Sequence, residues 1–335
     1  MPPILVTGSA GFIGYHVAER LLSDGHEVLG LDIVNDYYDP TLKEARLARL
    51  ARRSGYQHER VDLSDRDAMD ALFAAVKPPR VVHLAAQAGV RHSLKHPHDY
   101  VNSNLVGFLH ILEGCRHHGA GHLIFASSSS VYGSNVAMPF HESQAADHPL
   151  SIYAATKKAN EVMAHSYAHL YRLPCSGLRF FTVYGPWGRP DMALFLFARA
   201  ILAGEPIQVF NHGDMARDFT YVDDIVEGIV RLVDHPAAPE PAFDPHNPDP
   251  SVSDAPYRIY NVGHNKPVPL MELIATLERC LGKEADKQMV PMQPGDVSRT
   301  WASGERLFDA VGYEPQTSVE QGVAKFVEWY LEYYG

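Results

Sequence analysis

Three glycines near the start of the chain restrict its possible folds more than any other feature. Gly8, Gly11 and Gly14 follow the apolar run at residues 4–6 and open residues 10–22, where apolar side chains recur with helical spacing. A strand, a glycine-rich turn and a helix in this order form a backbone cradle that places a diphosphate at the positive end of the helix. The spacing Gly-x-x-Gly-x-x-Gly differs from the commoner Gly-x-Gly-x-x-Gly, but the physical argument is the same. The sequence therefore predicts a dinucleotide site at the start of an α/β fold.

Short apolar runs alternate with longer segments of helical period through the first half of the chain. We predict buried strands at residues 27–32, 81–84, 123–127 and 176–181, and helices at residues 69–76, 101–117 and 153–170. This alternation is typical of an α/β protein with a Rossmann-type, doubly wound parallel sheet.

The pattern is looser after residue 181. Residues 234–256 are rich in Pro and Asp, which predicts a surface loop, and a strand at 257–262 and helices at 270–281 and 319–333 are predicted after it. We expect residues 1–180 to form a cofactor-binding domain and residues 181–335 to form mainly a smaller C-terminal α/β lobe that binds the substrate. Segments near residues 218–262 are expected to return to the first domain.

Charge and cysteine content narrow the class of partner. The formal net charge is -11, so the chain repels nucleic acids and anionic membrane surfaces, and we expect neither as a partner. Cys115, Cys175 and Cys280 are few and far apart, as in a protein of a reducing compartment. Neither a signal-peptide pattern nor an apolar stretch of bilayer-spanning length is present, so we expect a cytoplasmic protein.

Polar and small residues after the predicted strands extend the cofactor site. Asp32 ends the second strand, where an acid binds the adenosine ribose diol and favours NAD over NADP by repelling a 2′-phosphate. Asp62 is expected near the adenine, and Ala85 and Ala86 leave room for the cofactor. The candidate NAD-binding residues are Gly8, Gly11, Phe12, Ile13, Gly14, Asp32, Asp62, Leu63, Ala85, Ala86, Gln87, Asn104, Tyr153 and Lys157.

A tyrosine–lysine pair carries the candidate chemistry. Tyr153 and Lys157 are four residues apart and so share one face of a predicted helix. They come after the predicted strand that ends in the serine run 127–130, and an open parallel sheet places reactive groups at such strand ends. A nearby ammonium and an oxidised nicotinamide lower the pKa of a tyrosine, which favours a phenolate base at neutral pH. A serine hydroxyl, that of Ser128 or Ser130, is expected to complete the proton path.

These residues together resemble the extended short-chain dehydrogenase/reductase family over nearly the whole chain. The run Arg217-Asp218-Phe219-Thr220-Tyr221-Val222-Asp223-Asp224 is typical of its sugar-nucleotide branch. Within that branch the chain is most similar to UDP-glucuronate 4-epimerases, and the motifs behind this similarity are Asn35-Asp36-Tyr37-Tyr38-Asp39, Ala86-Gln87-Ala88-Gly89-Val90-Arg91 and Arg179-Phe180-Phe181-Thr182-Val183-Tyr184-Gly185-Pro186-Trp187-Gly188-Arg189-Pro190-Asp191-Met192-Ala193. The resemblance implies bound NAD, a UDP-sugar substrate, and a homodimer formed through the helices at 101–117 and 153–170.

The resemblance also implies a role for each candidate residue. Tyr153 is expected to be the base that acts on the sugar 4-hydroxyl, with Ser128 as the second hydroxyl and Lys157 as its partner. A 4-keto glucuronate is a β-keto acid that tends to lose CO2, so its carboxylate must be held, and Arg189 and Thr182 are the candidates. Arginine forks match phosphate oxygens, and Arg217 and Arg299 are expected on the diphosphate, with Gln208 or Phe210 at the uracil. The candidate substrate-binding residues are Arg91, Ser128, Thr182, Arg189, Gln208, Phe210, Arg217 and Arg299.

Several alternatives remain open. The chain also fits a 4-epimerase of UDP-glucose or UDP-N-acetylglucosamine, or a UDP-glucuronate decarboxylase. Ser129-Ser130 stand where 4,6-dehydratases carry an Asp-Glu pair and decarboxylases a glutamate, which favours epimerisation. A non-enzymatic redox sensor that only binds NAD is disfavoured by the Tyr153/Lys157 pair. His92, His96 and His98 lie together in the sequence, but no carboxylate or cysteine pattern accompanies them, so no metal site is predicted.

Overall fold

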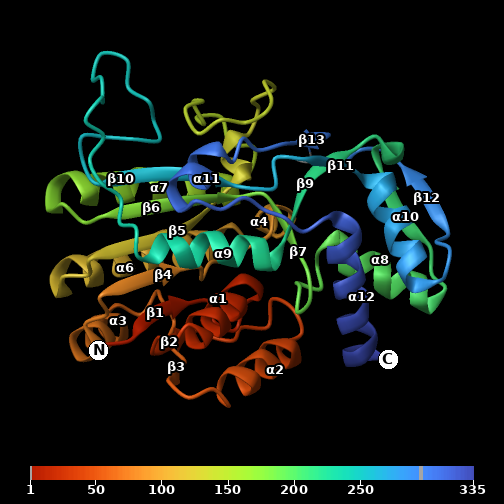
Figure 1. The fold of residues 1–335 in the computed structure, drawn as a ribbon, viewed down its shortest axis with the longest axis horizontal. Helices are drawn as coiled ribbons and strands as arrows, with labels where there is room; N and C mark the ends of the chain where they lie inside the picture. The colour runs from red at the N-terminus through yellow and green to blue at the C-terminus, as the bar shows by residue number, and fades with distance from the viewer. Residues whose placement is uncertain (1, 294–296) are drawn as a thin grey trace.

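A computed structural model describes residues 2–293 and 297–335, and a seven-stranded parallel sheet forms its centre (Figure 1). The strand order is β10-β6-β5-β4-β1-β2-β3. The strands of this sheet are β1 (Ile4–Thr7), β2 (Val28–Leu31), β3 (Tyr56–Glu59), β4 (Arg80–His83), β5 (His122–Ser128), β6 (Cys175–Phe180) and β10 (Tyr257–Val262). The order reverses at β1, between β4 and β2, which is where a doubly wound sheet opens a crevice at the carboxyl ends of its strands. The predicted Rossmann-type α/β class is confirmed.

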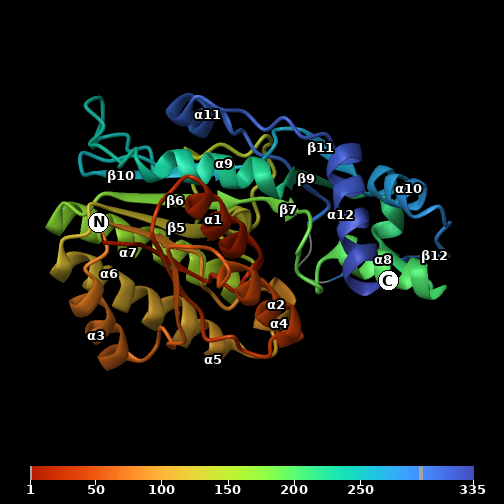
Figure 2. The ribbon, with the colours of Figure 1, turned by 60° about the horizontal axis from the view of Figure 1, so that its bottom comes forward.

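Helices cover both faces of the sheet (Figure 2). One face carries α3 (Arg66–Val76), α6 (Gly107–His118) and α7 (Ile152–Tyr171), and the other carries α1 (Phe12–Ser23), α9 (Val222–Val233) and α11 (Glu305–Val311). Alternate side chains of each strand enter separate cores, because successive residues of a strand point to opposite faces. In β1, Leu5 packs with the α3 and α6 side chains, whereas Ile4 and Val6 pack with those of α1 and α9.

Much of the chain after β6 forms a smaller lobe beside the sheet, seen in Figure 1 on the side that carries α8, α10 and α12. Its helices are α8 (Ala193–Ala203), α10 (Leu270–Leu281) and α12 (Val319–Tyr334). Beside them, β8 (Ile207–Phe210) pairs in parallel with β12 (Lys287–Val290). A four-stranded sheet joins the lobe to the central sheet, and consists of β7 (Thr182–Tyr184), β9 (Ala216–Tyr221), β11 (Pro267–Pro269) and β13 (Arg299–Thr300).

The helix predicted at residues 101–117 is not regular. It follows a short helix, α5 (Pro97–Tyr100), begins as a π-helical segment over Val101–Val106 and becomes α-helical only in α6. The carbonyl of Asn104 accepts a hydrogen bond from the Asn160 side chain at 2.7 Å, so this carbonyl has a partner outside the helix. The irregular turn therefore coincides with a contact between the π-helical segment and α7 that helical periodicity does not reveal.

Two features of the first half differ from the sequence analysis. The helix α2 (Pro40–Leu50) was not predicted, because Arg, Lys and Glu fill much of it. The strand β3 was not predicted either; it ends at Glu59, and Arg60 and Val61 follow it. β3 is the edge strand, and the side chains of its residues are only partly buried or exposed, which explains its weak apolar signal. No helix among the described residues combines enough length with enough apolar side chains to cross a membrane.

Candidate functional site

The turn between β1 and α1 is tightly packed against its own backbone. Gly8 has φ +76°, and a Cβ atom there would lie 2.8 Å from the amide nitrogen of Ala85. A Cβ atom on Gly11 would lie 3.0 Å from the Gly8 carbonyl oxygen, and one on Gly14 would collide with the same oxygen. Gly11 is also the N-cap of α1 and provides no side-chain cap for its first amides. These amides are thus available to an anion at the positive end of the helix.

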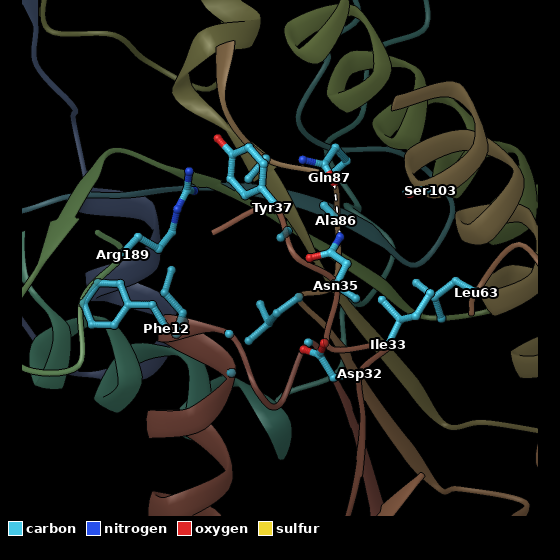
Figure 3. A pocket seen from close by; sticks show the side chains of 18 of the residues that line it. Phe12, Asp32, Ile33, Asn35, Tyr37, Leu63, Ala86, Gln87, Ser103 and Arg189 are labelled. Carbon is cyan, nitrogen blue, oxygen red and sulfur yellow. Dashed lines mark hydrogen bonds between the residues drawn. The ribbon is translucent and has the colours of Figure 1, made fainter. Parts of the chain in front are cut away.

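Asp32 directly follows β2 and lies at the floor of a cavity in front of this turn (Figure 3). Its carboxylate accepts hydrogen bonds from the amides of Ala10, at 3.2 Å, and Val34, at 2.8 Å. The carboxylate is therefore fixed between the glycine turn and the loop that follows β2.

The cavity in Figure 3 collects nearly all the cofactor residues expected from the sequence. Those that line it are Gly8, Gly11, Phe12, Ile13, Gly14, Asp32, Asp62, Leu63, Ala85, Ala86, Gln87, Tyr153 and Lys157. Asn104 is the exception, because it is buried behind Gln87. The Asn104 side chain accepts from the amide of Gln87 at 2.8 Å and donates to the Gln87 carbonyl at 3.1 Å. It thus positions the cavity wall and does not line the cavity itself.

Tyr153 and Lys157 lie one helical turn apart near the start of α7, next to the carboxyl end of β5. Burial raises the pKa of Tyr153, and a hydrogen bond with Ser128 and the charge of Arg189 oppose this rise. Burial lowers the pKa of Lys157 to about 8, and its ammonium donates to the carbonyl of Ala126 at 2.8 Å. Among the cations around Tyr153, it is therefore the Arg189 charge that lowers the pKa of this tyrosine in the structure.

The serine run divides into hydroxyls with different partners. Ser127 donates to the Glu161 carboxylate at 2.6 Å and is buried. Ser130 donates to the Ser128 hydroxyl at 2.9 Å, and Ser128 in turn is the partner of Tyr153. Tyr153, Ser128 and Ser130 thus form a chain of hydroxyls that leads away from the helix.

A buried ion pair holds α7, the helix of Tyr153 and Lys157, against the sheet. Arg179 of β6 donates to both carboxylate oxygens of Glu161, at 2.8 and 2.9 Å, and Glu161 follows Lys157 by one turn of α7. Burial by itself raises the pKa of Glu161, but the charge and hydrogen bonds of Arg179 outweigh it and leave the pKa below its usual value. This pair was not predicted, because its two members are far apart in the sequence.

A second cavity lies between the sheet and the smaller lobe and meets the first one. It is lined by every substrate-binding residue expected from the sequence, namely Arg91, Ser128, Thr182, Arg189, Gln208, Phe210, Arg217 and Arg299, and by Ser130. Ser128, Tyr153 and Arg189 line both cavities. A ligand in each cavity would therefore meet the other beside the Tyr153 hydroxyl.

The arginines of the second cavity have protein partners of different kinds. Arg189 forms an ion pair with Asp191 at 2.6 Å, and Arg299 approaches Asp214 at 3.4 Å in an exposed position. Arg217 donates to the backbone carbonyls of residues 297 and 298, at 2.5 and 2.9 Å. The Arg91 guanidinium lies 5.2 Å from the centre of the Phe210 ring, on the lobe side of the cavity.

Two residues around the site, Tyr37 and Arg46, have no role assigned from the sequence. Tyr37 lines both cavities, and its hydroxyl donates to Asp191 at 3.0 Å, so it supports the Arg189 ion pair. Arg46 of α2 is fully buried and donates to the carbonyls of Ala10, at 2.8 Å, and Gly188, at 3.2 Å. Tyr37 belongs to a motif that the sequence analysis noted, whereas nothing in the sequence singles out Arg46.

Comparisons with known proteins agree with this geometry. The model of the NAD dependent epimerase/dehydratase family matches residues 4–263. The chain is 55% identical over 331 residues to protein CapI of Staphylococcus aureus, with 99% of each chain covered. It is 51% identical to a probable UDP-glucuronate 4-epimerase of Rhizobium meliloti, over 98% of this chain and 97% of the relative.

A solved structure with a similar fold agrees with these sequence matches. The UDP-glucuronic acid 4-epimerase of Bacillus cereus, in complex with UDP-glucuronic acid and NAD, superimposes with a TM-score of 0.87 at 32% identity, over 99% of this chain and 100% of that one. The resemblance drawn from the glycine turn, the serine run and the Tyr153/Lys157 pair is confirmed. This chain belongs to the NAD dependent epimerase/dehydratase family.

Proposed function

We propose that this enzyme interconverts UDP-glucuronate and UDP-galacturonate by epimerisation at C4, with NAD as its cofactor. The observation that carries the proposal is the meeting of two cavities at Tyr153, Ser128 and Arg189. One cavity has the glycine turn and the acid that a dinucleotide requires, and the other is rich in arginines that suit a nucleotide diphosphate linked to an acidic sugar.

The first cavity fits NAD. The uncapped first turn of α1 suits a pyrophosphate, and the fixed carboxylate of Asp32 suits a ribose diol and repels a 2′-phosphate. Ala85, Ala86 and Gln87 complete the wall, held from behind by Asn104. Bound NAD supplies an acceptor for the hydride of C4 and a donor that returns it to the opposite face of the sugar.

Tyr153 is the group that removes and returns the proton of the 4-hydroxyl. Its pKa is raised by burial, so a phenolate requires compensation, and Ser128 and the Arg189 charge provide it in the structure. The Ser130 hydroxyl, bonded to Ser128, extends this path. Lys157 presents an ammonium beneath the same cavity and is suited to a ribose hydroxyl of the cofactor.

Arg189 holds the carboxylate of the hexuronate. Loss of CO2 from the 4-keto sugar requires the carboxylate to turn until its C–C bond aligns with the ketone, and a fixed cation resists this rotation. Asp191 and Tyr37 fix the guanidinium from one side, and Thr182 lines the same cavity. Arg217 and Arg299 are assigned to the diphosphate, Gln208 and Phe210 to the uracil, and Arg91 to the sugar side of the cavity.

Other parts of the chain complete the proposal. We assign residues 1–180, with segments near 218–262, to cofactor binding, and residues 181–335 mainly to the UDP-sugar. A homodimer through α6 and α7 is supported by the exposed apolar side chains of Leu109 and Val162, which are 39% and 57% exposed. A cytoplasmic site of action remains a prediction from the three spaced cysteines. Sedimentation of the purified protein tests the dimer.

The test of the reaction is incubation of the purified protein with UDP-glucuronate, without added NAD, followed by separation of the products. We expect UDP-galacturonate to accumulate to a fixed ratio with the substrate. Dominant UDP-pentose and CO2 would instead identify a decarboxylase, and turnover of neutral UDP-hexoses alone would contradict the role of Arg189.

A matched variant separates an enzyme from an NAD-binding sensor. Tyr153→Phe removes one hydroxyl and keeps the ring, so we expect a loss of about 100-fold or more in kcat. Circular dichroism and retention of NAD should be unchanged. An active Tyr153→Phe variant would refute the proposed base.

A further inference from the structure

A cluster of metal-binding side chains lies at the rim of the second cavity. His92 belongs to the short helix α4 (Val90–Ser93), His96 is the N-cap of α5, and Asp99 lies within α5. One possible ligand atom of each lies within 4.8 Å of those of the other two. Within residues 2–293 and 297–335 this is the one group of three His, Cys, Asp or Glu side chains with that property.

The backbone between the two short helices explains why the three side chains meet. The amide of His96 donates to the carbonyl of His92 at 3.0 Å, which continues the helical path beyond α4. His92 and His96 are four residues apart on this path and so lie on one side of it. At His96 the backbone turns away from helical geometry, with φ -128° and ψ 59°, and α5 then brings Asp99 within reach of both. The two imidazole rings are stacked with centroids 4.3 Å apart, and Nε2 of His92 lies 3.7 Å from the Asp99 carboxylate.

The chemistry of the three side chains indicates which metal ions they would bind. Two imidazoles and one carboxylate suit Zn²⁺ and its transition-metal neighbours, whereas Mg²⁺ and Ca²⁺ prefer oxygen ligands alone. Around a tetrahedral ion with bonds of about 2.1 Å, donors lie roughly 3.4 Å apart. Side-chain rotation closes the remaining gap, because His96 and Asp99 are exposed and His92 is partly buried. Water would occupy the fourth position.

We propose that His92, His96 and Asp99 bind one divalent transition-metal ion, of the Zn²⁺ or Ni²⁺ class. The ion would lie beside the substrate cavity, because His92 lines that cavity and its ring meets the Tyr37 ring edge-on at 5.0 Å. From the sequence alone, no carboxylate pattern was recognised beside these histidines. Asp99 stands three residues after His96, and the fold brings its carboxylate close to both imidazoles.

Titration calorimetry with ZnCl₂, on the full-length protein freed of any affinity tag, tests the site. We expect one ion per chain, and at least a tenfold weaker affinity for His96→Gln and for Asp99→Asn. His98→Gln is the matched control, since His98 is an exposed histidine of the same segment outside the cluster, and it should bind as the wild type does.

Two results would overturn the proposal. One is a wild-type protein that binds no Zn²⁺, and the other is binding that neither His96→Gln nor Asp99→Asn weakens, which would place the ion elsewhere among the 19 histidines. Because Zn²⁺ binding is measured without UDP-sugar, its outcome does not depend on the proposed reaction.

Discussion

Replacing Glu161 by glutamine removes one charge of the buried ion pair that fixes α7 against the sheet. The glutamine fits the same space, but its NH₂ group would face an Arg179 nitrogen that now lies 2.9 Å from a carboxylate oxygen. The Arg179 guanidinium has no exposed surface, so water cannot solvate the charge that remains. The variant therefore leaves a buried cation without its counter-ion.

The expected cost follows from this burial. Removal of one partner from a buried pair costs about 3–5 kcal/mol, which is a large share of a typical folding free energy of roughly 5–15 kcal/mol. The Ser127 hydroxyl donates to the other carboxylate oxygen at 2.6 Å and keeps an acceptor in the glutamine, so the cost comes from the Arg179 charge. Because Lys157 is one turn from Glu161 and Ser128 is next to Ser127, kcat should also fall.

Urea denaturation followed by circular dichroism measures the change in unfolding free energy. Glu44→Gln is the matched control, because Glu44 accepts from Arg60 with both oxygens at 2.7 Å but both side chains are about half exposed. An exposed pair contributes about 1 kcal/mol or less. The double variant Glu161→Gln/Arg179→Met should recover stability, since neither charge of this pair remains. Equal effects of Glu161→Gln and Glu44→Gln would refute the reasoning.

Two further predictions concern a cation and a histidine. Arg189→Met should lower kcat/KM for UDP-glucuronate by about 30-fold, which corresponds to the loss of a charged hydrogen bond of roughly 2 kcal/mol. The variant should also release UDP-pentose, which product chromatography measures. Unchanged kinetics and products would exclude the contact between Arg189 and the sugar carboxylate. Burial lowers the pKa of His122 to about 4 from an ordinary 6.5, so this residue stabilises the fold fully above pH 6.5 and loses about 3 kcal/mol as the pH falls to about 4. The slope of unfolding free energy against pH should therefore be smaller in His122→Gln over this interval, and parallel curves would contradict the assignment.

Features of the site that depend on local sequence were predictable. The glycine turn, Asp32 at a strand end and the spacing of Tyr153 and Lys157 follow from strand–turn–helix order and helical period. These patterns were enough to predict the fold class. Every expected site residue except Asn104 lines one of the two cavities, whereas Tyr37, which lines both, had no role assigned.

Features that depend on tertiary contact were not predictable. The role of Asn104 arises because two helices and a strand end meet at one buried amide. The pairing of Glu161 with Arg179, and of Tyr37 with Asp191, likewise depends on side chains that reach one another only in the folded chain. The period of apolar residues in the sequence indicates which face of a helix is buried. It does not indicate which side chains that face contacts.

Arg46 has a consequence for how the enzyme would select its substrate. It ties the carbonyl of Ala10, in the glycine turn, to that of Gly188, the residue before Arg189. The cation that we propose for the sugar acid is thus anchored to the dinucleotide half, while Gln208 and Phe210, proposed for the uracil, belong to the smaller lobe. With these assignments, two different parts of the protein would recognise the sugar and the base. Exchange of the lobe between relatives should then alter the preferred nucleotide while it preserves the preferred hexuronate.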